Sequence, residues 1–145
     1  SRGLGDVYKR QSPARFQQTA AKLLNLYIEN EEHCSPMMQS KIVEAWAQSE
    51  SYALSIYHTA SKMLAGGSIG SESSLGKIFW SELDHMMHQT ALKILGASAE
   101  LSNSSEHDAA QWIKGFMFSY GGPIYAGTNE IQKNIIAERL LGLPK

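Results

Sequence analysis

The chain has 145 residues, a formal net charge of −1 and a single cysteine, Cys34. This length supports one domain that buries roughly 68% of its unfolded surface. The balanced charge, with no stripe of Lys and Arg, excludes nucleic acid and anionic membranes as expected partners. A single cysteine allows neither an internal disulfide nor a thiol metal cluster, and no apolar run is long enough to span a membrane. We therefore expect a cytoplasmic protein.

The first segment, residues 1–11, reads SRGLGDVYKRQ and has two glycines but no hydrophobic periodicity. It has neither an initiator Met nor the apolar core of a signal peptide, and it looks like a translated cloning or sequencing-adapter scar. We expect a non-native or disordered leader here, followed by one domain over residues 12–145. On this interpretation the chain is a fragment, and its native sequence upstream of about Ser12 is not visible.

Two long helices are predicted in the first half of the chain. Pro13 after Ser12 and Pro36 after Ser35 are favourable helix starts. The first helix is expected over about residues 13–32, and the second runs to the pair of glycines at 66–67. The expected inner face of the first helix is Phe16, Ala20, Leu23, Leu24, Tyr27 and Ile28. The expected buried stripe of the second helix is Ile42, Trp46, Ser49, Ala53, Ile56, Ala60 and Met63.

Three further helices are predicted in the second half, over about residues 75–95, 108–118 and 129–141. The expected inner face of the first of these is Phe79, Leu83, Met86, Met87, Ala91 and Ile94. Residues 120–123 break the second, and Gly142 with Pro144 ends the third. No alternation typical of strands competes with this pattern. Long antiparallel helices with short connectors predict an all-α fold, an up-and-down helical bundle.

A glycine-punctuated turn opens directly into the last predicted helix. Gly127 can adopt backbone angles closed to other residues and lets a ligand approach the main chain. Thr128 or Asn129 can cap the helix, and Asn129 with Gln132 has the spacing of a capping box. The first turn of a helix suits a phosphate or an electron-rich ring oxygen. Most capped helices bind nothing, so capping alone does not establish a ligand site.

The full string from Tyr125 to Pro144, YAGTNEIQKNIIAERLLGLP, resembles the C-terminal signature of the acyl-CoA dehydrogenase family. Weaker resemblance extends through Leu75–Glu82 and Leu92–Gly96. The resemblance covers most of the chain from Ser12 onward, as the C-terminal helical domain of a much longer enzyme. It implies a domain similar to the helical bundle with which these enzymes end.

Members of this family bind FAD and remove two hydrogens from the α and β carbons of an acyl-CoA, as in fatty acid β-oxidation. The resemblance implies an oxidoreductase of this class, with electron-transfer flavoprotein or a similar acceptor taking the electrons. It places Gly127 at the acyl-CoA contact and Thr128, Asn129 and Glu130 at the FAD contact. In many members a glutamate just before the Gly-Thr pair is the catalytic base, and here that position is Ala126, which cannot accept a proton.

Two explanations for Ala126 stay open. In some branches of the family the base lies on an earlier helix, in sequence that this chain lacks. In other branches a subunit without the base serves a binding or scaffolding role in a heteromer. The resemblance further implies a homo- or hetero-oligomer, and apolar helices alone would leave exposed patches. We expect the 145-residue chain to be inactive by itself, since the family's middle β-domain holds most of the flavin.

A remote alternative, drawn from the residues themselves, is a metal-binding helical bundle. Glu82 and His85 form a Glu-x-x-His pair, the spacing used by di-iron carboxylate bundles. Such a site needs a second Glu-x-x-His pair, and the sequence has none. We therefore predict no metal site and interpret the pair as part of a polar helix face.

Overall fold

The computed structural model describes residues 12–100 and 107–144, so the predicted leader at residues 1–11 lies outside the described part. The described residues form five α-helices: α2 (Pro13–Glu29), α3 (Pro36–Leu64), α4 (Glu72–Leu95), α5 (His107–Ser119) and α6 (Asn129–Ile135). Short 3-10 turns cover Glu31–His33 and Gly96–Glu100, and a π-helical turn, Ile136–Leu140, continues α6. Over the described ranges no residue lies in a strand, which confirms the all-α fold.

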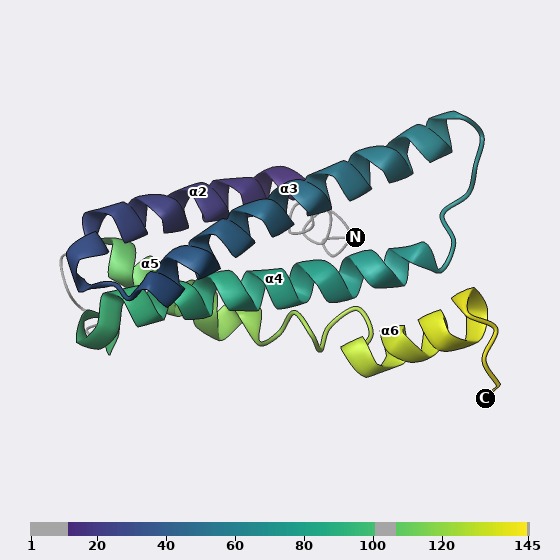
Figure 1. Cartoon of the computed structure of the whole chain (residues 1–145). Helices are drawn as coiled ribbons and strands as arrows, with labels where there is room; N and C mark the ends of the chain where they lie inside the picture. The colour runs from purple at the N-terminus through teal and green to yellow at the C-terminus, as the bar shows by residue number, and fades with distance from the viewer. Residues whose placement is uncertain (1–11, 101–106, 145) are drawn as a thin grey trace.

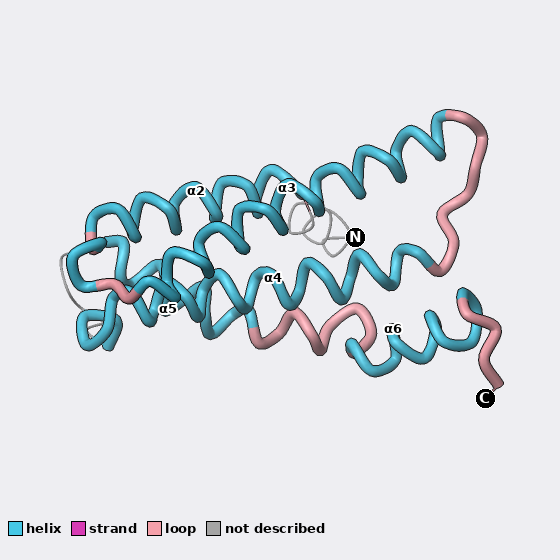
Figure 2. The backbone as a smooth tube through the Cα atoms, in the orientation of Figure 1, coloured by secondary structure: helices cyan, strands magenta, loops and turns pink. Residues whose placement is uncertain are grey.

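The helices form an antiparallel bundle in which each long helix reverses the direction of the one before it (Figure 1). α2 and α3 lie together over α4, and α5 packs against the C-terminal half of α4. α6 runs along the N-terminal half of α4, at the other end of that helix (Figure 2). Because α4 contacts every other α-helix of the bundle, its side chains decide how the last helix and its preceding turn are placed.

Helix boundaries follow the local sequence with small differences. Ser12 and Ser35 are extended, and a proline at the first helical position starts α2 and α3, as predicted. α2 ends at Glu29, one turn before the predicted end, where Asn30 donates its side-chain amide to the Leu26 carbonyl. α4 begins at Glu72, one turn before the predicted start, because the Glu72 carboxylate accepts hydrogen bonds from the Gly70 N–H and from Lys62.

The last helix also changes type near its end, which the sequence did not predict. The N–H of Leu141 donates to the Ile136 carbonyl at 3.0 Å, a five-residue spacing that widens the last turn into a π-helix. Gly142 then takes a φ of +67°, and the Leu143 N–H donates to the Ala137 carbonyl at 2.9 Å. This is the glycine-dependent helix stop that the sequence indicated at Gly142.

One continuous core lies where α2, α3 and α4 meet. Its fully enclosed side chains include Phe16, Leu23, Trp80, Leu83 and Met87. The predicted inner face of α4 is buried at Leu83, Met87, Ala91 and Ile94, whereas Met86 is half-buried and Phe79 lies at the rim. On α2 the buried position near the end is Leu26, and Ile28 is exposed.

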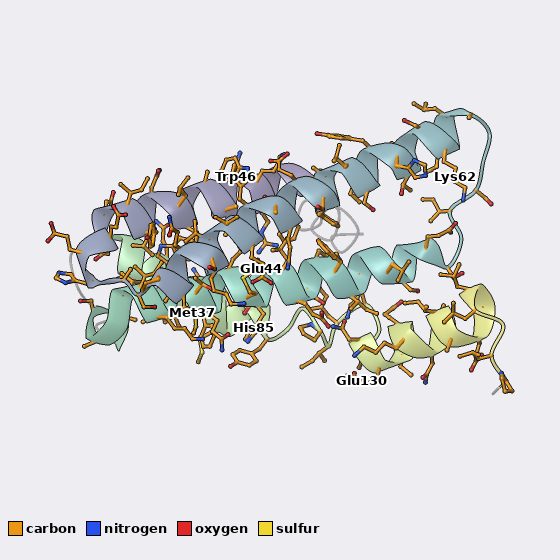
Figure 3. The ribbon with its side chains drawn as sticks, viewed as in Figure 1. Met37, Glu44, Trp46, Lys62, His85 and Glu130 are labelled. Atoms are coloured by element: carbon orange, nitrogen blue, oxygen red, sulfur yellow. The ribbon has the colours of Figure 1, made fainter. Side chains whose placement is uncertain are left out.

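The predicted stripe of α3 is wrong at Trp46 and again toward the end of the helix. Ile42, Ser49 and Ala53 are buried as expected, but Trp46 is 45% exposed and Met63 is 50% exposed. Trp46 lies on the outer side of α3 (Figure 3). The C-terminal half of α3 extends beyond α2, so among the described helices only α4 faces it, and Met63 is left exposed there. In the part of the chain that the structure describes, no helix is long and apolar enough to cross a membrane.

Candidate functional site

The glycine-rich connector between α5 and α6 leads to the turn at residues 126–128. Gly121 starts it, and its carbonyl accepts from the N–H groups of Ile124 and Tyr125, both at 3.0 Å. The Tyr125 ring packs against Trp80 of the core, with 5.8 Å between the ring centroids. The connector is therefore tied to α4 one residue before the turn begins.

The turn itself has two consecutive residues with left-handed φ. Gly127 has a φ of +84°, as a glycine can, but Ala126 has a φ of +56°, which is costly for a residue with a Cβ. A Cβ at Gly127 would lie 2.8 Å from Nε2 of Gln132, so the glycine also allows a close approach. Gln132 donates from that nitrogen to the Ala126 carbonyl at 3.1 Å. Ala126 and Gly127 are both exposed.

The structure selects Thr128 as the helix cap. Its backbone is extended, and its hydroxyl oxygen accepts from the Ile131 N–H at 3.3 Å. The predicted capping box of Asn129 with Gln132 does not form, because Asn129 is already the first helical residue and Gln132 reaches back to Ala126. The cap therefore lies one residue earlier than the box requires.

Asn129 faces the interior of the protein. Its side-chain oxygen Oδ1 accepts from Nζ of Lys77 at 2.7 Å, and its Nδ2 donates to Oγ of Ser81 at 3.2 Å. Lys77, Ser81 and Asn129 are all buried. The backbone N–H of Asn129 donates to the Pro123 carbonyl at 2.9 Å. The predicted FAD contact at Asn129 thus has its side chain and its N–H already engaged within the protein.

Two charged groups near the turn have shifted pKa values. Burial lowers the pKa of Lys77, and the neighbouring Glu130 carboxylate opposes that shift. The pKa of Glu130 is lowered by its own backbone N–H, then by a hydrogen bond from Thr128, with smaller effects from Lys133 and Lys77. Glu130 is exposed on the side of α6 that faces away from α4 (Figure 3). The turn therefore has a buried positive charge on its inner side and an exposed negative charge on its outer side.

The geometry leaves the turn with donors for a ligand. Among the described residues, no acceptor pairs with the backbone N–H groups of Gly127 and Thr128. Two adjacent N–H groups without an acceptor can bind an oxygen of a carbonyl or a ring. The structure thus brings four predicted residues together with different exposure: Ala126, Gly127 and Glu130 exposed, and Thr128 half-buried.

Lys77 and Ser81 are the residues near this site that sequence reasoning missed. They lie four residues apart on α4, so they share one face of the helix. Their spacing does not predict that they are buried near the turn, because a lysine in an amphipathic helix normally faces solvent. Only their position inside the family-like stretch Leu75–Glu82 pointed to them.

The Glu-x-x-His pair is not assembled as a metal site. Glu82 is exposed, whereas Nδ1 of His85 lies 3.0 Å from Oγ of Ser119 and its ring stacks on Phe116. Over residues 12–100 and 107–144, no group of three or more His, Cys, Asp or Glu side chains is placed to hold a metal ion. The metal-binding alternative therefore has no set of ligands in the described part.

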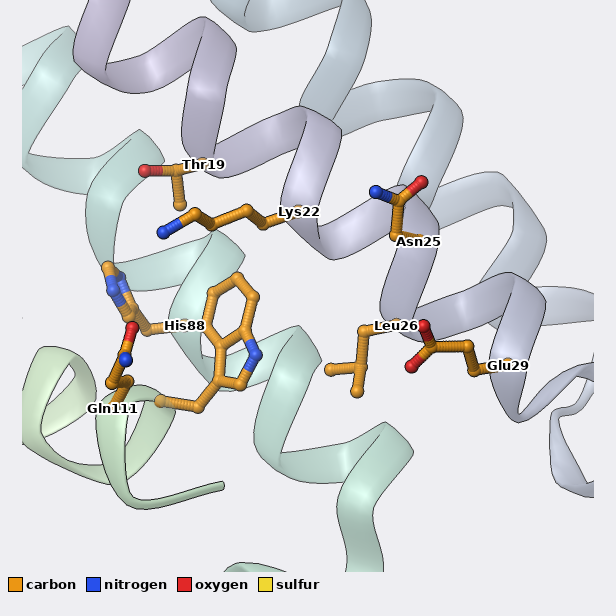
Figure 4. A pocket seen from close by; sticks show the side chains of 8 residues that line it. Thr19, Lys22, Asn25, Leu26, Glu29, His88 and Gln111 are labelled. Carbon is orange, nitrogen blue, oxygen red and sulfur yellow. The ribbon is translucent and has the colours of Figure 1, made fainter. Parts of the chain in front are cut away.

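A separate polar cavity of about 300 Å³ lies between α2, α4 and α5. Lys22 and Glu29 of α2 line it together with His88 of α4 and Gln111 of α5 (Figure 4). Nδ1 of His88 lies 2.7 Å from the Asp84 carbonyl oxygen, and a Cβ at Gly115 would lie 2.2 Å from its Nε2. Both nitrogens of His88 are therefore enclosed by the fold. His88 is also about 16 Å along α4 from Lys77, so this cavity is distinct from the turn.

Comparison with protein families matches residues 33–141 to the model for the C-terminal domain of acyl-CoA dehydrogenases. Two curated relatives, both called acyl-CoA dehydrogenase IpdE1, are each 29% identical over 113 residues, which is 76% of this chain. One is from Mycolicibacterium smegmatis and the other from Mycobacterium tuberculosis. The chain spans only 26% and 28% of their respective lengths.

A solved structure, a variant of the Tcur3481-Tcur3483 steroid ACAD, has the same fold. It superposes with a TM-score of 0.75 at 18% identity and covers 92% of this chain and 36% of its own. The family model and the fold agree on the same domain, and the residues matched by the family model include the turn at residues 126–128.

Proposed function

The chain belongs to the family of acyl-CoA dehydrogenase C-terminal domains, and on that premise we propose that it is the C-terminal domain of an FAD-dependent acyl-CoA dehydrogenase. The observation that supports this function most directly is the exposed turn at residues 126–128. It combines two left-handed residues, two N–H groups with no acceptor among the described residues, and a cap that leads into α6. Because the chain spans about a quarter of the length of its curated relatives, the rest of the enzyme must complete the site.

In this proposal Gly127 contacts the acyl-CoA. Removing a proton from the α carbon places negative charge on the thioester carbonyl oxygen, and a fixed N–H donor stabilises that charge. Among the described residues the Gly127 N–H has no acceptor, and Gly127 is exposed, so this N–H is chemically suited to the role. No side chain blocks the approach to this backbone, because Gly127 has none.

Thr128, Asn129 and Glu130 form the proposed FAD contact. The Thr128 N–H suits an electron-rich ring oxygen, and its hydroxyl is held by the Ile131 N–H. Glu130 is the exposed member of the three, whereas Asn129 contributes by placing the other two. When bound, FAD accepts the β hydrogen as hydride, and electron-transfer flavoprotein or a similar acceptor is the proposed next carrier.

Ala126 leaves the usual position of the base without a proton acceptor. We propose that the base comes from sequence outside this chain, either on an earlier helix of the same polypeptide or on another subunit. In the second case the chain is a binding or scaffolding subunit of a heteromer, the alternative function. The name of the solved neighbour, which pairs two proteins, favours keeping that alternative. The exposed apolar residues of α3 give either assembly a surface to cover.

Two classes of acyl-CoA thioester are candidates for the substrate. Fatty acyl-CoA thioesters follow from the general activity of the family. The solved neighbour is described as a steroid ACAD, so steroid acyl-CoA thioesters are the second candidate class. The test is reduction of the bound flavin by each class in the complete natural protein, measured anaerobically by absorbance.

The turn is tested in the complete natural protein with a matched pair of variants. Gly127→Ala should reduce flavin content or raise the Kd for FAD, whereas Gly142→Ala should leave both unchanged. Both glycines have positive φ, +84° and +67°, so both variants have comparable backbone strain, but only the first lies in the turn. A complete protein that neither copurifies with flavin nor binds added FAD contradicts the proposed function.

A further inference from the structure

Lys77 is a buried charge that the proposed function leaves without a role. It is 6% exposed, although it lies near the N-terminal end of a long helix where a lysine could face water. Burying an ammonium group costs free energy unless hydrogen bonds compensate. The hydrogen bond at 2.7 Å from Lys77 to Oδ1 of Asn129 is therefore the contact that compensates for the burial of its ammonium group.

The hydrogen-bond chemistry of the three buried side chains fixes the orientation of the Asn129 amide, although the Ser81 hydroxyl also lies 3.3 Å from Oδ1 of Asn129. Lysine only donates, so it requires the oxygen of the Asn129 amide and not its nitrogen to face α4. The Ser81 hydroxyl has one hydrogen, which is best placed for the Ile78 carbonyl at 2.9 Å. Its oxygen then accepts from Nδ2 of Asn129 at 3.2 Å. Lys77 thus determines which way the Asn129 amide points.

We propose that Lys77 is a positioning residue that, through Asn129, holds the turn at residues 126–128 in its binding geometry. Asn129 is attached at two points, by its side chain to α4 and by its N–H to the Pro123 carbonyl at 2.9 Å. Those attachments enclose the turn from its helix side, and Tyr125 packs against Trp80 on its other side. An apolar residue at position 77 could fill the same space but could not orient the amide.

This inference deepens the proposed function and rests on it, because the turn that Lys77 holds is the one assigned to acyl-CoA and FAD. It gives α4 a part in the site through the hydrogen bond from Lys77 to Asn129, which needs no contact between Lys77 and the ligands. Lys77 is therefore a positioning residue and not a catalytic one.

The first test is amide hydrogen exchange in the 145-residue chain without any ligand. Lys77→Met should accelerate exchange at the N–H groups of Asn129 and Ile131 by roughly tenfold, with little change at Leu23 of α2. Lys62→Met is the matched control, because Lys62 forms an exposed ion pair with Glu72 at 2.9 Å. Faster exchange at all amides alike, or no change at Asn129 and Ile131, overturns the proposal.

A second pair of variants keeps the test decisive if Lys77→Met does not fold. Asn129→Asp keeps an acceptor of the same shape for Lys77, and Asn129→Leu removes it. The aspartate variant should retain slow exchange at Ile131, whereas the leucine variant should lose it. Equal exchange in the two variants overturns the proposal.

The ligand arm uses FAD binding to the complete natural protein. Lys77→Met should raise the Kd for FAD by about tenfold, while Lys62→Met leaves it unchanged. If the wild-type protein does not bind FAD but Lys77→Met still loosens the turn, the proposed function fails and the positioning role holds. If the wild type binds FAD and Lys77→Met changes neither exchange nor Kd, the positioning role fails and the function stands.

Discussion

Arg15 of α2 and Asp84 of α4 are joined through one guanidinium nitrogen. Nη2 of Arg15 lies 2.9 Å and 3.0 Å from the two carboxylate oxygens of Asp84. Asp84 is almost completely buried, at 2% exposed, whereas Arg15 is half-buried. The pair therefore connects two helices that are far apart in sequence. Most of the free-energy cost of removing the pair from water arises at Asp84, because its carboxylate is the more buried group.

The first prediction follows from this asymmetry. Arg15→Met should lower the free energy of unfolding by about 3 kcal/mol, because it removes the guanidinium from a buried carboxylate whose other near group, Nδ1 of His88, lies 3.5 Å from Oδ1. Lys41→Met removes an exposed ion pair with Glu44 and should cost less than about 1 kcal/mol. Urea unfolding of both variants measures the difference. Adding Asp84→Asn to Arg15→Met should recover part of the loss, and equal costs for the two single variants contradict the prediction.

Gly115 of α5 allows a close approach to a buried histidine. A Cβ at this position would lie 2.2 Å from Nε2 of His88 and 2.3 Å from its Cδ2. Gly115→Ala should therefore destabilise the fold by about 2 kcal/mol, since the imidazole is held in place by the Asp84 carbonyl. Gly76→Ala, within α4, meets no atom within 4 Å and should stabilise by about 0.5–1 kcal/mol. Thermal unfolding should show opposite signs for the two variants.

Ala126 has a left-handed φ of +56° without being glycine. Ala126→Gly should raise the free energy of unfolding by about 0.5 kcal/mol, because relief of the steric cost exceeds the added entropy of glycine. Ala126→Val should lower it by more than about 1 kcal/mol, since β-branched residues avoid this region. Chemical denaturation of the two variants tests the conformation of the turn. The reverse order of stabilities would show that position 126 does not have a positive φ.

Tyr52 makes the free energy of unfolding depend on pH in the alkaline range. Burial raises its pKa to about 12 from the ordinary 10.0, and the ring packs against Phe16 and Phe79. Between pH 10 and 12 the unfolded chain releases this proton while the folded chain keeps it, so the folded state binds more protons and stability falls as pH rises. The loss attributable to Tyr52 should reach about 1 kcal/mol by pH 11.

The control for this prediction is the same substitution at two positions of α3. Tyr52→Phe should reduce the fall in stability between pH 10 and 11, whereas Tyr57→Phe, at an exposed position, should leave the fall as in the unmodified chain. Urea unfolding at several pH values gives both slopes. A slope that is unchanged by Tyr52→Phe would assign the alkaline loss to other groups.

Hydrophobic periodicity and helix signals predicted most of the fold. Pro13 and Pro36 start their helices where expected, and Gly142 ends the last one with a positive φ. These features depend on residues close together in the chain, so their physics is local. The motif around Gly127 and Thr128 was likewise readable, because its family signature is continuous in sequence.

Other features required the tertiary structure. The exposure of Met63 near the end of α3 depends on where α2 begins, which its own helix cannot indicate. The choice of Thr128 over Asn129 as the cap depends on Lys77, 52 positions away in sequence, which turns the Asn129 side chain inward. Sequence patterns place a lysine on the surface, because lysines are rarely buried. The burial of Lys77 became visible only in the packing of the tertiary structure. The sequence alone thus indicated the family and most of the helices. The support beneath the turn was decided by contacts between α4 and α6, because buried hydrogen bonds join residues that no local pattern pairs.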